Sequence, residues 1–359
     1  MLIVGAGLAG GLLALALREL QLPVAVVDPA LSSPLGPLTQ PSASRISYGA
    51  IPGWPLAPTP LARLAAGASR RWQQLERRHG SLGWQRRRLR LQGDAAALPA
   101  ISRFWPLPFS QVDGAQLMAA LPRRLAAAGV ALHGARVEAL ERDGAAGWQL
   151  RLASGELLRA PQVVLAAGAG VRALWPAVPA ALRCSWAAVL QLDAFPPVLG
   201  RAAAWLPQRF QRVALEQRAA ELQQPEWLVD VGLVPWASGA LLGQHSLVRP
   251  GLACAAPPEA AATEAQLRQA LAAHPWGSRL AALPAQLLQA PVAFCPGGRP
   301  LVGPLPEAEG LWLFSGFSAA FSQVPVLAPL LAPCLAGSGG AAAAAERRLQ
   351  QLGVWPAGG

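Results

Sequence analysis

A glycine-rich turn between two short apolar segments constrains the fold of this chain more than any other stretch. Leu2–Val4 is apolar, a G-x-G-x-x-G turn occupies residues 5–10, and a leucine- and alanine-rich run leads to a second apolar segment that ends at Asp28. This order predicts strand, turn, helix, strand and acid, which is the βαβ unit that binds dinucleotides. The residues expected to contact the dinucleotide are Gly5, Ala6, Gly7, Leu8, Ala9, Gly10 and Asp28.

Each glycine of the turn has a physical role in that unit. Gly5 allows the sharp bend, Gly7 lets the backbone approach a pyrophosphate, and Gly10 lets the helix pack closely on the strand. The first turn of the helix offers free N–H groups and the positive end of a dipole to the phosphates. Asp28 is placed to accept hydrogen bonds from a ribose diol.

Two other interpretations fit the first residues. A secretory signal would explain the apolar run Met1–Leu17, but no basic segment precedes it and three glycines interrupt it. A βα turn without a ligand is the second alternative. Because the motif starts almost at residue 1, we expect no targeting peptide before it.

The composition is that of a folded protein with a basic excess. The 359 residues suffice for two domains, and a hydrophobic content of 53% with 14% charged residues excludes a disordered chain. No apolar run of about 18–20 residues is free of glycine, proline or charge, so we expect no membrane span. The net charge of +11 comes from arginine alone, since the sequence contains no lysine. Arginine clusters such as Arg86–Arg90 are typical of a solvated surface; an acidic substrate or a nucleic acid is the alternative partner.

The cysteines and histidines predict neither a metal site nor a disulfide framework. The chain has 4 of each, scattered and without C-x-x-C or comparable ligand spacing. A disulfide framework is also unusual in a large chain without a secretory signal. We therefore expect a cytoplasmic protein.

The rest of the chain alternates loop, helix and strand patterns. Residues 29–60 have loop composition, and we expect the segment Thr39–Arg45 to run beside a cofactor, with an exposed connection as the alternative. A buried strand at 163–165 ends in small residues that leave a nucleotide room to approach. Helices are predicted at 61–79, 113–128, 264–274 and 323–335, a single strand at 84–91, a β-meander at 130–159, an antiparallel or mixed sheet at 183–250, and helix or coil at 341–345.

A second unit of strand, glycine and helix lies at residues 310–335. The apolar run ends at Gly316, and the following helix could direct its N-terminus at a ring atom that becomes anionic on reduction.

Four separated segments together resemble the FAD-dependent D-amino-acid oxidase superfamily, which includes glycine, sarcosine and D-amino-acid oxidases. They are the opening turn with Asp28, Val112-Asp113-Gly114, residues 163–169, and residues 299–304 through 316–318. The resemblance implies an α/β fold, with a Rossmann-type, glutathione-reductase-like FAD-binding domain and a substrate domain built on a mixed or antiparallel sheet. We expect the FAD-binding domain to comprise residues 1–60, 105–182 and 291–359, and the substrate domain residues 61–104 and 183–290.

The resemblance also implies an activity and further cofactor contacts. Members of the superfamily oxidise a C–N bond by hydride transfer to flavin N5, and dioxygen then reoxidises the flavin and yields hydrogen peroxide. Some relatives attach the flavin through a cysteine in the region of Cys295, but the surrounding sequence differs, so we expect non-covalent FAD. The further residues expected at the cofactor are Arg45, Ala167, Gly168, Gly316, Phe317 and Ser318.

The chain departs from the family where the substrate would bind. The arginine that commonly holds the substrate carboxylate is missing from Val292–Cys295, and the active-site tyrosine has no counterpart on the substrate sheet because Tyr48 is the only tyrosine. Phe321 stands where many members have a glycine-rich run, and it would crowd either the flavin or the start of the helix.

The substrate carboxylate therefore needs another cation, preferably a bidentate arginine. The candidates are Arg299, Arg45, Arg183 and Arg249. His245 follows a predicted strand and could face the flavin ring, with a hydrogen-bonded histidine of the sheet as the alternative. Arg299, His245 and Arg45 are the catalytic candidates.

Three functions remain open on the sequence. The first is an FAD-dependent oxidase of an amino acid or secondary amine, with dioxygen as acceptor. The second is a flavoenzyme that oxidises a modified uridine of tRNA, held by the arginine clusters. The third is a flavin-binding protein with a degenerate substrate pocket and no amine oxidase activity. The substrate and the choice between monomer and homo-oligomer stay open.

Overall fold

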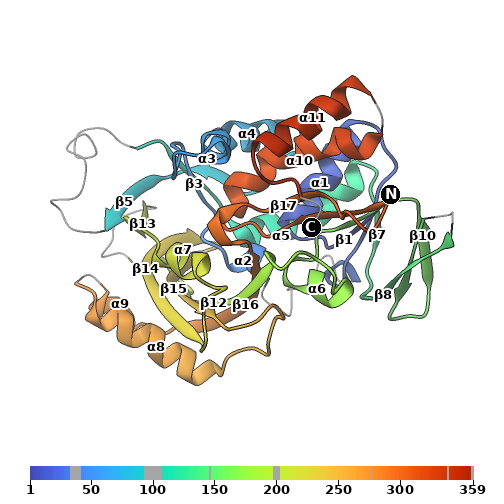
Figure 1. Ribbon diagram of the computed structural model, residues 1–359. Coiled ribbons are helices and arrows are strands. Elements are labelled where there is room, and N and C mark those ends of the chain that lie inside the picture. The colour runs from blue at the N-terminus through green and yellow to red at the C-terminus, as the bar shows by residue number, and fades with distance from the viewer. Residues whose placement is uncertain are drawn as a thin grey trace.

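The computed structural model describes residues 1–32, 42–92, 107–144, 147–196, 203–275, 277–337 and 339–356. Within these ranges two large and two small sheets are covered by helices (Figure 1). The predicted α/β fold, with one parallel sheet and one largely antiparallel sheet, is confirmed. Residues 39–41 of the segment expected beside the cofactor lie outside the described ranges. No described helix combines the length and the apolar character that crossing a lipid bilayer requires.

The opening motif forms the centre of the first large sheet. Its strands, in order, are β17 (Leu301–Pro304), β18 (Leu311–Ser315), β11 (Val163–Leu165), β1 (Leu2–Val4), β2 (Ala25–Val27) and β7 (Ala131–His133). Neighbours run parallel except β17 and β18, which are antiparallel. The carboxyl ends of β1, β2, β11 and β18 therefore meet at one edge, where open α/β sheets bind ligands.

Alternate residues of β1 serve two different cores, because side chains of a strand point to opposite faces in turn. Ile3 packs toward helices, whereas Leu2 and Val4 pack toward an antiparallel meander at the right of Figure 1. The helices are α1 (Leu8–Glu19), α3 (Pro60–Ala65), α4 (Ala68–His79), α5 (Gly114–Ala127), α10 (Ala320–Ala336) and α11 (Gly340–Gln351). The meander consists of β8 (Val137–Arg142), β9 (Trp148–Leu152) and β10 (Leu157–Ala160).

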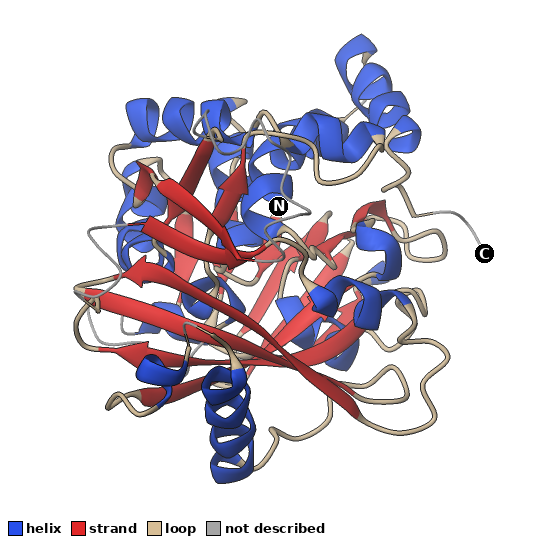
Figure 2. Cartoon of the chain, turned by 90° about the vertical axis from the view of Figure 1, so that its left-hand side faces the viewer, coloured by secondary structure: helices blue, strands red, loops and turns tan. Residues whose placement is uncertain are grey.

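The second large sheet lies between that helical layer and a helix on its far side (Figure 2). Its strands, in order, are β16 (Gln286–Phe294), β12 (Arg183–Leu192), β15 (Gly239–Val248), β14 (Glu226–Trp236), β13 (Ala203–Pro207) and β5 (Arg88–Gln92). The outer face packs on α8 (Ala260–Ala273), where Leu267 and Leu271 are fully buried against Leu242. Each such leucine contributes about 1.5–3 kcal/mol of burial free energy.

Short elements connect these layers. A small sheet has the order β3 (Ala50–Pro52), β6 (Phe109–Val112), β4 (Trp84–Arg86). The short helices are η1 (Pro29–Ser32), α2 (Ala43–Ile46), η5 (Gly168–Gly170), α6 (Val171–Leu174), α7 (Gln211–Gln217), α9 (Ser278–Ala281) and η7 (Pro296–Gly298).

The single helix expected at 61–79 is instead two helices. Thr59 caps α3 by accepting from Ala62 N, and the chain turns at Gly67, a residue of low helix propensity, before α4 begins. Leu61 and Trp72 join the core of the first large sheet, and Trp72 Nε1 donates to a carbonyl of α10. Residues 61–79, which we expected to belong to the substrate domain, pack on the helical side of the first large sheet.

Several strand predictions were also wrong in detail. The expected strand at 84–91 is split, since β4 joins the small sheet and β5 forms an edge of the second large sheet. The apolar run at 130–132 pairs with β2 as β7 rather than with the meander. The segment 341–345, in contrast, was expected to be helix or coil and is helical within α11.

One disulfide bond is present although the cysteine pattern predicted no disulfide framework. Cys184 at the start of β12 is bonded to Cys254, which follows β15, with their Cα atoms 5.2 Å apart. β12 and β15 are antiparallel neighbours, with Ser185 opposite Val248, and this pairing brings the two cysteines together across 70 residues. Such a contact depends on sheet pairing and leaves no local spacing signal.

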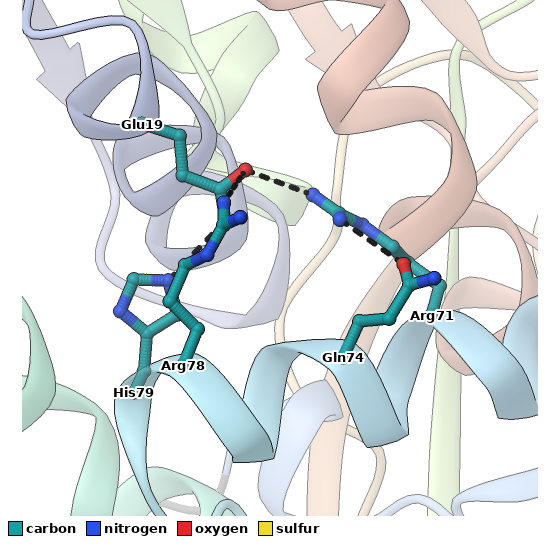
Figure 3. A network of polar contacts seen from close by, with 5 residues as sticks. All are labelled: Glu19, Arg71, Gln74, Arg78 and His79. Carbon is teal, nitrogen blue, oxygen red and sulfur yellow. Dashed lines mark hydrogen bonds and ion pairs between the residues drawn. The ribbon is translucent and has the colours of Figure 1, made fainter.

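One acidic side chain connects α1 to α4. The carboxylate of Glu19 lies 2.7 Å from Arg78 Nη1, 3.3 Å from Arg71 Nη2 and 3.3 Å from His79 Nε2 (Figure 3). Burial by itself raises the pKa of Glu19, but the charge of Arg71 and hydrogen bonds from His79 and Arg78 outweigh it, so that the pKa lies below its ordinary value. The cluster therefore holds a carboxylate that is charged at neutral pH.

Replacing Glu19 with Gln is expected to lower the free energy of unfolding at pH 7 by about 1–2 kcal/mol, because hydrogen bonds to charged partners contribute on that scale. A depressed folded-state pKa makes this contribution complete above the unfolded pKa of about 4.3, and it is lost as pH falls through the folded pKa. Urea unfolding at pH 7 and at lower pH measures the difference, which should shrink on acidification. The exposed Glu138, with no ion pair among the described residues, provides the control Glu138→Gln; equal losses in both variants would contradict the assignment.

Candidate functional site

A cavity of about 2020 Å³ extends from the carboxyl edge of the first sheet to the inner face of the second. Sites for single small molecules occupy about 300–1,000 Å³, so this cavity has room for a dinucleotide and a second molecule. The expected cofactor residues that line it are Gly5, Gly7, Leu8, Ala9, Asp28, Ala167, Gly168, Gly316, Phe317 and Ser318. Among the described residues, Ala6, Gly10 and Arg45 are expected contacts that do not line it.

The three glycines of the turn meet different surroundings. Gly5 has φ +110°, and a Cβ there would lie 2.5 Å from the carbonyl oxygen of Ala166. A Cβ on Gly10 would collide with the carbonyl oxygen of Gly5. Gly7 has an ordinary φ of −68°, and its nearest neighbour would be Ser44 Oγ at 3.3 Å. The fold requires Gly5 and Gly10, whereas Gly7 keeps open a space that a bound phosphate group would fill.

Polar groups around that space are positioned for a nucleotide. Asp28 accepts from Ala6 N at 2.7 Å and from Ala30 N at 2.8 Å, so its two oxygens are fixed at the end of β2 with lone pairs left for a diol. Ser44 Oγ accepts from Leu8 N at 3.1 Å, in the first turn of α1. The site thus offers an acid at the ribose position and a helix N-terminus at the phosphate position.

The other end of the cavity is formed by two glycine-containing turns. Gly297 and Gly298 of η7 both have positive φ, and nothing lies within 4 Å of a Cβ on either. Gln323 of α10 donates to the carbonyl of Gly298 at 2.9 Å and accepts from Ala319 N at 3.3 Å, which holds the two turns together. A Cβ on Gly316 would collide with Cys295 Sγ, so this strand end stays close to the second sheet.

Arg212 of α7, which the sequence reasoning missed, is the arginine most closely tied to this end of the cavity. Its guanidinium donates to Ser318 O at 2.8 Å and to Glu216 Oε1 at 3.1 Å, and Nε is buried without a partner among the described residues. Asp230 fixes the start of α7 by accepting from Arg212 N at 3.1 Å. Burial raises the pKa of Glu216, against the charge of Arg212, and burial likewise raises that of Asp230. The hydrogen bond from Arg212 to Ser318 O thus connects α7, whose start is fixed by Asp230 of β14, to the segment after β18.

The other candidate side chains are not brought together. Arg45 stacks on Trp236, with Cζ 5.4 Å from the ring centroid. His245 Nε2 donates to Gln266 Oε1, 2.9 Å away on α8, and the imidazole stacks on Trp227. Catalytic roles for Arg45 and His245 are therefore not supported, because each is held by partners outside the cavity.

Of the three other candidate arginines, two hydrogen-bond to the backbone and one is available to a ligand. Arg183 donates to backbone carbonyls of Ala219 and Gly251, and Arg249 donates to that of Ala256, so both serve the fold. Arg299 lines the cavity, is exposed, and makes no hydrogen bond or ion pair within the described part of the chain. It is the expected candidate that retains a cation for a ligand.

Two aromatic residues singled out in the sequence lie at the cavity. Tyr48 lines it and donates to Gly232 O at 3.1 Å, so a tyrosine reaches the site from the connection between α2 and β3 rather than from the second sheet. Burial, followed by the charge of Asp230, raises the pKa of Tyr48 well above its ordinary value. Phe321 stacks on Trp72 with centroids 6.2 Å apart, so its ring is accommodated at the start of α10.

Cys295 does not line the cavity, and burial raises the pKa of its thiol to about 12. Among the described residues, no three His, Cys, Asp or Glu side chains are grouped so that they could hold a metal ion.

Comparison with known proteins agrees with this geometry. A family model described as FAD dependent oxidoreductase (DAO) matches residues 107–333, which confirms the resemblance noted in the sequence. Similar solved structures include glycine oxidase from Geobacillus kaustophilus (19% identity, 93% of both chains, TM-score 0.64) and L-proline dehydrogenase from P. horikoshii (12% identity, 93% of this chain and 92% of that one, TM-score 0.68). Iminodiacetate oxidase from Chelativorans sp. BNC1 has 17% identity over 94% and 95% of the two chains, with a TM-score of 0.64. These structures establish the fold, and no curated protein sequence matches the chain.

Replacing Gly7 with Ala is expected to separate cofactor binding from folding. The free energy of unfolding of the cofactor-free protein should stay within about 1 kcal/mol of the original, since the added methyl meets only Ser44 Oγ. The affinity for FAD should fall at least tenfold, about 1.4 kcal/mol, because the methyl enters the phosphate space. Thermal unfolding and FAD titration measure the two effects.

The contrasting variant is Gly10→Ala, which should destabilise the protein with or without FAD because its methyl collides with Gly5 O. An unchanged FAD affinity in Gly7→Ala would show that the phosphates do not approach this turn.

Proposed function

Because the chain belongs to the FAD-dependent oxidoreductase family, we propose that it oxidises the C–N bond of an amino acid or a secondary amine. The substrate loses a hydride from carbon and a proton from nitrogen and becomes an imine, which water hydrolyses. FAD, the cofactor of the family, would supply the two-electron acceptor for this hydride, and dioxygen would then take up the two electrons and two protons to give hydrogen peroxide.

The single observation that carries this proposal is the continuous cavity from the glycine turn to the inner face of the second sheet. A substrate bound on that face would lie against the ring end of a dinucleotide whose phosphates lie at the turn. Hydride transfer from a neutral amine needs close alignment and exclusion of water rather than an acid–base dyad. The absence of His245 from the cavity is therefore compatible with catalysis.

The cofactor contacts follow from the same geometry. We propose that the phosphates of FAD bind at the turn of residues 5–10 and that Asp28 binds the ribose. Ala167 and Gly168 would lie against the nucleotide next to this turn. Residues 316–318 would contact the flavin ring, with Arg212 holding Ser318 in place through its carbonyl. We assign FAD as non-covalent, because the buried, protonated thiol of Cys295 lies off the cavity.

Arg299 is the proposed anchor for a substrate carboxylate. Its guanidinium lines the cavity and has no partner among the described residues, so its donors are available for a bidentate contact. Arg212 is less suited to this role, since Glu216 already neutralises its charge. Arg299 would therefore select substrates that carry a carboxylate.

Purified protein with bound FAD is expected to release hydrogen peroxide when it is incubated with a panel of D- and L-amino acids, N-methyl amino acids and secondary amines. A peroxidase-coupled assay measures the product, and anaerobic mixing detects bleaching of the flavin when dioxygen is not the acceptor. Bound FAD with neither bleaching nor peroxide across the panel would favour a flavin-binding protein with a degenerate pocket.

Replacing Arg299 with Met is expected to raise KM for carboxylate-bearing substrates about 10- to 100-fold, because a charge-assisted hydrogen bond contributes about 1.5–3 kcal/mol. KM for amines without a carboxylate should stay unchanged. Arg299→Lys keeps the charge but not the bidentate geometry. Its KM for carboxylate-bearing substrates should therefore lie between those of the original protein and Arg299→Met. An equal rise for both substrate classes would count against a carboxylate contact.

A further inference from the structure

The end of the cavity farthest from β16 is bounded by apolar side chains from four segments. This apolar wall is defined by Ala50, Trp54, Leu89, Leu91, Phe109 and Leu206. Phe109 and Leu206 belong to one buried cluster, against which Trp54 and Leu89 pack, and β5 and β13 place Leu91 beside Leu206. The wall is thus one continuous surface rather than a set of scattered contacts.

The sequence of β5 explains why this surface is apolar in a strongly basic segment. Leu89 and Leu91 line the cavity, whereas the alternating Arg88 and Arg90 are exposed. Side chains of a strand point to opposite faces, so the arginines that suggested an acidic partner are directed away from the cavity.

A second group of apolar residues lines the cavity toward the other edge of the sheet. Ala187 and Val189 of β12 line the same cavity, and β12 is separated from β5 by β15, β14 and β13. Neighbouring strands lie 4.7–4.9 Å apart, so this group and the leucines of β5 are about 19 Å apart across the sheet. Among the described strands of the second sheet, Gln244 is the one polar side chain on this lining.

Charged side chains line the cavity elsewhere. They are Asp28, Arg136, Arg209, Arg212 and Arg299. They come from the nucleotide end, from the segment around α7 and from beside η7, so none of them lies on the strands that form the apolar wall. A ligand that reached the apolar wall would therefore leave the arginines near α7 and η7 and bind among hydrocarbon side chains.

We infer that the amine or amino acid oxidised by this protein carries a long or bulky apolar group, which binds along the apolar wall while the reacting carbon lies at the flavin. This inference rests on the proposed function. A buried methylene contributes a roughly constant free energy, so each one added to the ligand should strengthen binding by up to about fourfold until the wall is covered.

The test uses the FAD-loaded enzyme and two series of probes that differ only in chain length. Straight-chain carboxylates from acetate to octanoate and the corresponding n-alkylamines are titrated by calorimetry, and kcat/KM is measured for glycine, alanine, norvaline and norleucine. Affinity and kcat/KM should rise about two- to fourfold per methylene over at least four methylenes. Flat or falling trends in both binding series would overturn the inference.

Substitutions in the apolar wall test whether the chain-length trend depends on this surface. Leu91→Trp fills the cavity from the edge strand and should flatten the chain-length trend, lowering the affinity for octanoate at least tenfold while acetate is unaffected. Ala50→Leu adds bulk from a second segment and should act in the same direction if Leu91→Trp fails to fold. The control is Leu157→Trp on β10, a 44% exposed position off the cavity, which should keep the original trend.

The two proposals fail in different ways. A rising binding trend without peroxide or flavin bleaching from any amine would keep the apolar ligand site and reject the oxidase. Oxidation of glycine with falling activity toward longer chains would keep the oxidase and reject the apolar substrate.

Discussion

The close backbone contact between β1, α1 and the end of β11 is the constraint on which the rest of the structure depends. The carbonyl of Gly5 lies against Gly10, and Gly5 itself lies against the carbonyl of Ala166, so neither position has space for a side chain. This contact sets the distance between the central strand and its helix, and it brings the small residues after β11 beside the glycine turn. The other residues that line the cavity are positioned relative to this edge of the first large sheet.

Sequence patterns predicted correctly those elements that are stabilised by interactions between residues close in the sequence. The G-x-G-x-x-G unit, the helix that Asp113 caps, and the strand at 163–165 were all found from short-range signals, because a cap, a turn glycine and a run of buried residues each act within a few positions. The helix expected at 61–79 failed at Gly67, where one residue of low helix propensity ends an otherwise continuous apolar face. The strand expected at 84–91 failed because its two halves find partners in different sheets, which no local pattern records.

The features missed from the sequence are set by long-range pairing. Cys184 and Cys254 meet only because β12 and β15 are neighbours, and Tyr48 reaches Gly232 across 184 positions. In the sequence, Arg212 cannot be distinguished from a surface arginine of a helix. It has Ser318 as a partner only because α7 packs beside η7. Local spacing does show that Arg212 and Glu216 can pair at i and i+4, but not that the pair is buried in a cavity.

The contrast between Arg212 and Arg299 determines how the site can discriminate among ligands. Arg212 is tied to a buried carboxylate, and a second carboxylate beside it would face the charge of Glu216, whose raised pKa already reflects the cost of burying that charge. Arg299 has no such neighbour among the described residues and lies where an anionic group meets no acidic partner. A single contact with one exposed cation does not fix the orientation of a ligand. Further selectivity has to come from apolar surface that is buried when the ligand binds. In the proposed function, recognition would therefore depend on the apolar wall as much as on charge.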